Sequence, residues 1–181
     1  NSYLSILIAN HVMQTSLNNS STKAYDDNKP LIDSILGDTY FKFHFQQKYD
    51  NVIELLENPI ENKNIKTAEF QSSQASGIID DIVENAKGKV IYIDHWGTWC
   101  APCINEFKES TPALVNKLHK DVEFIYMCYK SEEEQWKATI SKFQLEGIHY
   151  FINDELIGDM RQLFAIEGFP TYTIINKKGE I

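Results

Sequence analysis

The stretch of sequence that decides the fold is Ile93-Asp94-His95-Trp96-Gly97-Thr98-Trp99-Cys100-Ala101-Pro102-Cys103. It continues Val90-Ile91-Tyr92-Ile93, a short apolar run that is typical of a strand buried on both faces. A helix is predicted to begin near Ala101, because Pro102 then lies in the first turn, where its missing N–H is not needed. Cys100 and Cys103 therefore lie one turn apart at a helix start, close enough to form a disulfide. The positive end of a helix stabilises a thiolate, so this pattern indicates thiol chemistry at Cys100.

Two further positions are predicted to lie near this cysteine pair. Asp94 ends the predicted strand six residues before Cys100. A carboxylate at the end of an apolar strand is costly unless it has a partner or a task. Pro170 follows Phe169 and directly precedes a predicted strand, so a tight turn there would bring this backbone beside the cysteines.

Alternating strand and helix patterns predict an α/β domain over residues 77–181. The predicted elements are a helix from Ser76 to Ala86, strands at Val90–Ile93, Val122–Cys128, Ile148–Ile152 and Thr171–Ile175, and helices after Cys100, after Ser131 and over Glu155–Phe164. Ser131 and Glu134 have the spacing of a capping box, and Pro112 is expected to kink its helix. The succession of strand, helix and strand around Cys100 predicts a right-handed βαβ unit.

Residues 1–70 show apolar side chains at helical spacing and are predicted to be a mainly helical segment. The polar run Asn18–Pro30 is expected to separate two helices, and Pro59 to end the last. Alternation at Phe41, Phe43 and Phe45 leaves one short strand as an alternative. Residues 71–76 are short, polar and rich in small side chains, which predicts a linker to the domain at 77–181.

The overall composition excludes several classes of protein. The 181 residues are 43% hydrophobic and 24% charged, which is typical of a globular chain. Lys and Arg number 17 against 26 Asp and Glu, so the net charge is −9 and no basic stripe offers a nucleic-acid site. No apolar run approaches the roughly 18 residues of a membrane helix. No signal peptide is recognisable after Asn1, and a chain from which a signal peptide had been removed would look the same.

Two motifs resemble a known family. The stretch from Ile93 to Cys103, followed by Glu106 and Phe107, resembles the active-site segment of thioredoxin-fold proteins, above all the bacterial extracytoplasmic thiol-disulfide oxidoreductases of the TlpA/ResA type. Gly168-Phe169-Pro170-Thr171-Tyr172 and Asn176-Lys177-Lys178-Gly179-Glu180 are similar to that family's proline-containing strand and hairpin. The resemblance covers residues 77–181 and implies a thioredoxin-like fold, a central mixed sheet flanked by helices, with a cis peptide bond before Pro170. It also implies a further strand and helix after Glu180, which are expected to be missing from this sequence.

The resemblance implies a role for each matching residue. Cys100 is the attacking cysteine, Cys103 the resolving cysteine, and Asp94 the buried carboxylate that takes the proton of the resolving thiol. Trp99, Phe169 and Pro170 are implied to contact substrate, and Trp96 to pack beside the site. No metal and no cofactor is implied. His95 replaces a more usual aromatic residue, so a titratable ring is expected near Asp94.

The function expected on this basis is disulfide exchange with protein substrates, as a reductase supplied by an upstream redox partner. The expected location is the bacterial periplasm or another extracytoplasmic site, with membrane contact only through an anchor before Asn1. Two alternatives remain open. The pair could be half of a zinc site, although zinc needs four ligands and only Cys128, on a predicted buried strand, is left. The domain could instead be a redox-inert interaction module stapled by a structural disulfide.

Overall fold

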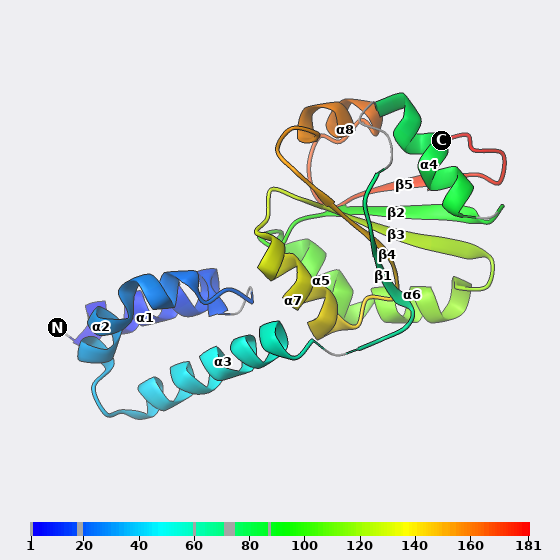
Figure 1. The fold of residues 1–181 in the computed structure, drawn as a ribbon. Coiled ribbons are helices and arrows are strands. Elements are labelled where there is room, and N and C mark those ends of the chain that lie inside the picture. Colours follow the sequence, from blue (N-terminus) through cyan, green and yellow to red (C-terminus); the bar gives the residue numbers. More distant parts are fainter. Residues whose placement is uncertain (1, 18–19, 60, 71–74, 87) are drawn as a thin grey trace. The chain divides into compact units, whose positions relative to one another are not determined.

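A computed structural model describes residues 2–17, 20–59, 61–70, 75–86 and 88–181 (Figure 1). The chain divides into two compact units, Asn1–Glu61 with Lys137–Lys142, and Asn62–Trp136 with Phe143–Ile181. Each unit has its own cluster of buried apolar side chains. The predicted boundaries at 1–70 and 77–181 stay a prediction, since residues 71–74 of the linker lie outside the described residues.

The described part of the N-terminal region forms the helices α1 (Ser2–Thr15), α2 (Lys23–Leu36) and α3 (Tyr40–Glu57). Their buried core is Ala9, Val12, Met13, Leu17, Tyr25, Ile32, Leu36 and Phe45. The alternative of a strand at Phe41–Phe45 is wrong, because these residues lie in α3 and only Phe45 turns inward. Helix α3 ends two residues before Pro59, as predicted.

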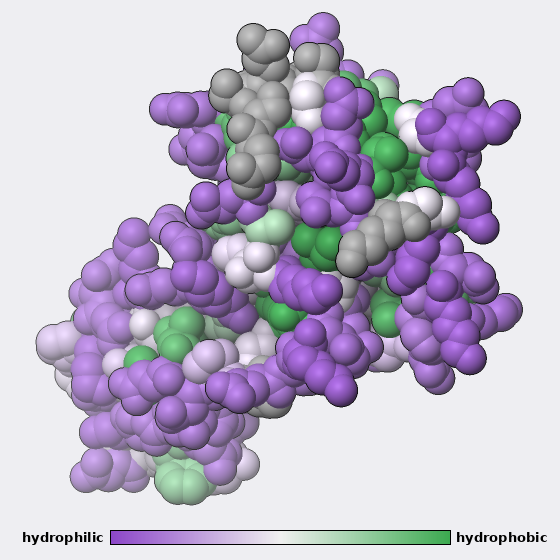
Figure 2. Space-filling view, turned by 45° about the vertical axis from the view of Figure 1, so that its right-hand side comes forward, coloured by the Kyte–Doolittle hydropathy of each residue, from purple (hydrophilic) through white to green (hydrophobic). Residues whose placement is uncertain are grey.

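Helix α2 begins earlier than the sequence indicated. The polar run Asn18–Pro30 was expected to separate helices, but α2 starts at Lys23 and contains Pro30. A proline inside a helix removes one backbone N–H, and here the buried side chains Tyr25 and Ile32 on either side hold the helix in the core. No helix in the described ranges combines the length and the apolar character needed to cross a membrane. Hydrophilic residues dominate the face of the molecule shown in Figure 2.

The second unit is built on a mixed five-stranded sheet with the order β1-β4-β3-β2-β5. The strands are β1 (Ile65–Ala68), β2 (Val90–Trp96), β3 (Val122–Tyr129), β4 (Gly147–Ile152) and β5 (Thr171–Ile175). Neighbours pair in parallel except β5, which runs antiparallel to β2. The predicted α/β class and thioredoxin-like architecture are thereby confirmed.

Helices cover both faces of this sheet (Figure 1). Helices α4 (Ala75–Asn85) and α8 (Ile157–Leu163) lie on one face, and α5 (Ala101–Glu109) and α6 (Thr111–Leu118) lie on the other. Helix α7 (Glu133–Phe143) connects β3 with β4. The side chains of Ile91 and Ile93 join the apolar cluster of α4 and α8, whereas Trp96 packs against Phe107 of α5. Alternation along β2 therefore turns Tyr92, Asp94 and Trp96 toward the α5 face.

Two details of this unit differ from what the sequence predicts. Strand β1 lies in the segment predicted to be mainly helical, for which the one alternative strand was at Phe41–Phe45. Its four residues are half-exposed or exposed and pair only with β4, so no apolar run marks them. The helix after Cys100 is divided at Ser110 rather than kinked within, and Pro112 lies in the first turn of α6. A proline is well tolerated in the first turn of a helix, so Pro112 is compatible with a second helix that starts at Thr111.

Candidate active site

The cysteine pair lies at the beginning of α5. Cys100 is the N-cap residue, and its Sγ accepts the backbone N–H of Cys103 at 3.3 Å. Pro102 occupies the first turn, as predicted. The two cysteines form a disulfide, and only 3% of Cys100 and 1% of Cys103 is exposed. A sulfur that accepts an N–H at the positive end of a helix is stabilised as an anion, so reduction of the pair would leave Cys100 placed to ionise.

The turn before Cys100 is held by the segment that follows β3. The backbone N–H of Thr98 donates to Ser131 Oγ at 3.0 Å, and the Thr98 hydroxyl bonds Gln135 Oε1 at 3.0 Å. Ser131 in turn donates to the carbonyl of Tyr129 at 2.9 Å. Helix α7 begins at Glu133, which confirms the helix predicted there. These bonds fix the backbone from which Cys100 projects.

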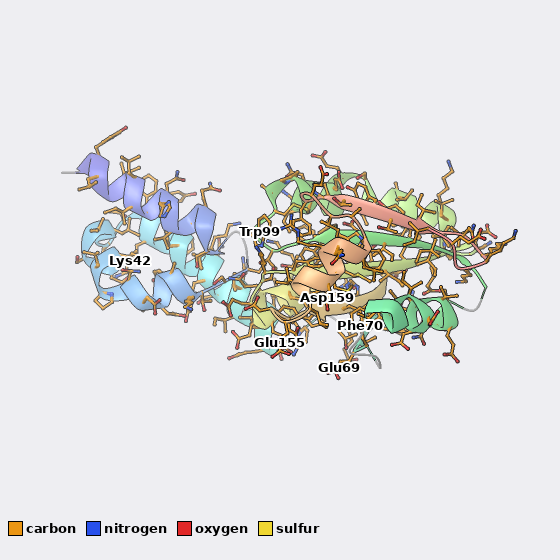
Figure 3. The ribbon with its side chains drawn as sticks, turned by 90° about the horizontal axis from the view of Figure 1, so that it is seen from above. Lys42, Glu69, Phe70, Trp99, Glu155 and Asp159 are labelled. Carbon is orange, nitrogen blue, oxygen red and sulfur yellow. A yellow bond between two sulfur atoms is a disulfide. The ribbon has the colours of Figure 1, made fainter. Side chains whose placement is uncertain are left out.

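The Trp99 ring joins the turn to the loop before β5. Its Nε1 donates to the carbonyl of Tyr129 at 3.3 Å, and half of the side chain is exposed. The ring lies edge to face with Phe169, with 5.6 Å between the centroids. A Cβ at Gly97 would come within 2.8 Å of Trp99 Nε1, so this position accepts only glycine without a shift. Figure 3 labels Trp99, which lies at the end of the sheet where β2 ends.

The loop before β5 places the predicted proline beside this turn. The peptide bond between Phe169 and Pro170 is cis. Thr171 pairs directly with His95 in the antiparallel ladder, and the Phe169 ring also packs against Tyr129 at 5.2 Å between centroids. The structure therefore brings Phe169 and Pro170 to the same end of the sheet as Trp99 and the cysteines.

Asp94 is buried beneath the helix that carries the cysteines. Only 3% of the residue is exposed, and its Oδ1 has no hydrogen-bond partner among the described residues. Burial, and then the negative charge of Glu106, raise the pKa of Asp94 to about 8. At neutral pH the carboxyl group therefore holds a proton in an apolar site, on the face of the sheet that α5 covers.

The sequence of this region matches a family model described as thioredoxin-like, over residues 88–181, more than half of the chain. The chain belongs to the thioredoxin-like family. Its thioredoxin-like region is 23% identical over 100 residues to the thiol-disulfide oxidoreductase ResA of Bacillus subtilis, covering 55% of this chain and 54% of that protein. To the ResA of Oceanobacillus iheyensis it is 25% identical over 116 residues, covering 62% and 59%. The chain spans about half the length of the curated relatives it matches.

A solved structure shows the same fold as the thioredoxin-like unit. The thioredoxin domain of a thiol-disulfide oxidoreductase from Bacteroides vulgatus superimposes with a TM-score of 0.50 at 21% identity. The match covers 54% of this chain and 70% of the other. At this level of identity the likeness concerns the fold alone, and it agrees with the strand order described above.

Two residues near Asp94 in the thioredoxin-like unit were missed as site residues. Glu106 lies one helical turn after Cys103, on the side of α5 that faces β5. The hydroxyl of Tyr172 donates to its carboxylate, and the Tyr172 ring stacks on Tyr92 at 5.6 Å between centroids. Tyr172 is also the ladder partner of Asp94. In the sequence, Glu106 could have been found from its three-residue spacing after Cys103. Tyr172 could have been found from its two-residue spacing after Pro170.

The His95 ring does not lie near Asp94, the position expected from the sequence. The alternation of β2 turns the ring away from Asp94, to the face of the sheet covered by α8. There Nδ1 bonds the Tyr129 hydroxyl at 2.9 Å and Nε2 bonds Thr173 Oγ1 at 3.0 Å. Burial lowers the pKa of His95 to about 3, so the ring is neutral at physiological pH. The expectation of a titrating ring near Asp94 is wrong, because neighbouring residues of a strand face opposite sides.

The third cysteine, Cys128, lies on β3 away from solvent. Burial raises the pKa of its thiol to about 12, so it stays protonated. Within the described ranges, no three His, Cys, Asp or Glu side chains are grouped so that they could hold a metal ion.

Proposed function

We propose that the thioredoxin-like domain, residues 77–181, is a thiol-disulfide oxidoreductase that reduces protein disulfides through Cys100-Ala101-Pro102-Cys103. The observation that carries the proposal is the position of Cys100 at the cap of α5, bonded to the N–H of Cys103 and paired with it in a disulfide. The membership of the thioredoxin-like family and the similarity to ResA support it.

The reaction begins from the dithiol form. The Cys100 thiolate attacks one sulfur of a substrate disulfide, and the other substrate sulfur leaves as a thiolate. The Cys103 thiol then loses its proton and attacks Cys100 Sγ, which releases the second substrate sulfur. Two electrons have passed to the substrate, and Cys100 and Cys103 are again joined. An upstream protein dithiol returns them to the reduced form by the same steps in reverse.

Asp94 is the proposed acceptor for the Cys103 proton. It lies under α5, and its pKa of about 8 suits exchange with a thiol, whose usual pKa is about 8.5. In the resting state its carboxyl group is mostly protonated, and it becomes a base when it ionises. We expect Asp94→Asn to slow the resolving step more than the first attack, so a mixed disulfide would accumulate. Equal effects on both steps would make Asp94 a structural residue.

The proposed substrate is an extended protein segment. Trp99 and Phe169 form an apolar lip beside the cysteines, and Phe169 and Pro170 directly precede β5. Backbone groups of these two residues can pair with an added strand, which would place a substrate cysteine against Cys100. The resemblance to ResA supports an extracytoplasmic location.

The competing proposal is a redox-inert interaction module with a structural disulfide. An insulin-reduction assay with dithiothreitol should show acceleration by the wild type, and Cys100→Ser should abolish it. Undiminished activity of the variant would exclude the proposed reaction. The reduction potential separates the two classes independently: a value of roughly −120 to −270 mV favours exchange, and one well below about −300 mV favours a structural staple.

A further inference from the structure

Three titratable side chains form a row across the middle of the sheet. Asp94 on β2 is the direct partner of Tyr126 on β3, and Tyr126 is the direct partner of His149 on β4. Directly paired residues turn their side chains to the same face of a sheet, so all three point toward the side covered by α5. The ring of Tyr126 stacks on that of His149, 4.8 Å between centroids, and meets Phe107 of α5 edge to face at 6.0 Å.

Each member of this row carries a buried polar atom with no hydrogen-bond partner among the described residues: Asp94 Oδ1, the Tyr126 hydroxyl and His149 Nδ1. Tyr126 and His149 are completely buried. An unpaired buried polar group costs about 1–3 kcal/mol, so three in one row call for an explanation. In His149, Nε2 donates to the carbonyl of Leu145 at 2.7 Å, and burial lowers the pKa of the ring to about 4. The ring is therefore neutral, and its Nδ1 is a hydrogen-bond acceptor.

The row also borders a cavity. A cavity of about 470 Å³ lies between α6 and the segment before β4, and Tyr126 forms part of its wall. The other walls include Thr111, Val115, Phe143 and Leu145. It is large enough to admit water to polar groups that border it. The Tyr126 side chain thus lies between Asp94 and this cavity, which neither Cys100 nor Cys103 lines.

We propose that Tyr126 is a positioning residue that stabilises the ionised Asp94 carboxylate, with its hydroxyl donating toward Asp94 through one water molecule admitted from this cavity. The inference rests on the proposed function, in which Asp94 accepts the proton of Cys103. No electrons move: the Asp94 O–H bond breaks, the proton passes to water, and the Tyr126 O–H turns toward the charge that is left.

The charges around the pair are consistent with this role. Asp94 faces Glu106 on α5, Tyr172 on β5 and Tyr92 on its own strand, and the charge that acts on Asp94 is that of Glu106. That charge is negative and opposes ionisation of Asp94. Tyr126 faces Glu146 as well, which also disfavours negative charge on the row. A buried hydroxyl donor is then the group in this row that can favour the carboxylate.

The test measures the pKa of Asp94 directly, in the oxidised full chain, by a carbon-13 NMR titration of its carboxyl group. Tyr126→Phe should raise this pKa by about 1, because a hydrogen bond to the charged form is lost. The matched control is Tyr150→Phe, which removes the hydroxyl of a buried tyrosine on the opposite face of the sheet and should leave the value unchanged. An unchanged pKa in folded Tyr126→Phe would overturn the proposal.

A second variant keeps the experiment decisive if Tyr126→Phe does not fold. Incorporating 3-fluorotyrosine at position 126 retains the ring and makes the hydroxyl a stronger donor, so the pKa of Asp94 should fall. A rise or no change would contradict the proposal. Insulin reduction as a function of pH separates this inference from the proposed function. If Tyr126→Phe raises the pKa of Asp94 but does not shift the pH profile of insulin reduction, Asp94 does not take part in the reaction. The interaction between Tyr126 and Asp94 would still be supported.

Discussion

The rings of Trp99 and Phe169 meet edge to face, with their planes at 87° and their centroids 5.6 Å apart. Seventy residues separate them in the sequence, yet this contact joins the turn that carries Cys100 to the loop that carries Pro170. Because Trp99 is half exposed, the contact leaves part of its ring free for another molecule. The pair therefore links the turn of Cys100, the proposed attacking cysteine, to the surface proposed to dock substrate.

Removal of the Trp99 ring should weaken the use of protein substrates. Trp99→Ala deletes an exposed apolar surface without opening the core, so we expect kcat/KM for insulin to fall about tenfold, a loss typical of one good apolar contact. Reduction of a small disulfide should change less than about twofold. Ile174→Ala removes another exposed apolar side chain from β5 and serves as the control. Parallel losses on both substrates would show damage to the cysteine site instead of lost docking.

The buried carboxyl group should make stability fall as the pH rises. The pKa of Asp94 is about 8 in the folded protein, against about 3.9 for an unfolded aspartate, so the folded state holds an extra proton between these values. This contribution is complete below pH 4 and is lost as the pH rises to 8. Compared with wild type, Asp94→Asn should therefore gain about 5 kcal/mol in free energy of unfolding between pH 4 and pH 9.

Urea unfolding at several pH values measures this difference. Asp121→Asn changes an exposed aspartate of the same unit and should show no comparable gain. A constant difference between Asp94→Asn and wild type across this range would contradict the raised pKa.

Glu106 should control the proton affinity of Asp94 through its charge. Glu106→Gln removes the negative charge beside Asp94 and retains an oxygen that can accept from Tyr172, so the pKa of Asp94 should fall. The matched control is Glu109→Gln, which removes the same charge from an exposed position of the same helix. Carbon-13 NMR titration of Asp94 gives both values. An equal response to the two variants would attribute the effect to net charge alone.

The buried imidazole of His95 should make the protein sensitive to acid. Its pKa is about 3 when folded and about 6.5 when unfolded, so stability is lost as the pH falls below 6.5. This loss amounts to about 2 kcal/mol between pH 7 and pH 5. His95→Asn should be less stable at pH 7 by about 1–3 kcal/mol, because the bonds to Tyr129 and Thr173 are lost, but it should escape the acid-dependent loss.

Thermal or urea unfolding at both pH values checks this expectation. His119→Asn, at an exposed position, is the control and should follow the wild type. If His95→Asn loses as much stability as the wild type on acidification, the neutral buried ring is not the cause.

Local chemistry in the sequence was enough to predict the centre of the molecule. The three-residue spacing of Cys100 and Cys103, with Pro102 between them, requires only the geometry of one helical turn. The continuous apolar runs of β2 and β3 predict buried strands because each position must be apolar when both faces are covered. These features depend only on residues that are close in the sequence, so they can be predicted without knowing the fold.

Apart from the predicted meeting of Pro170 with the cysteines, the tertiary structure alone decided which distant residues meet. Strand β1 has no apolar run and exists through its pairing with β4, and the row of Asp94, Tyr126 and His149 follows from strand register. Glu106 became a neighbour of Asp94 only when α5 covered the sheet. The physical reason is that pairing register and burial are set by long-range packing, and the same burial moves the pKa values of Asp94 and His95 in opposite directions by disfavouring charge.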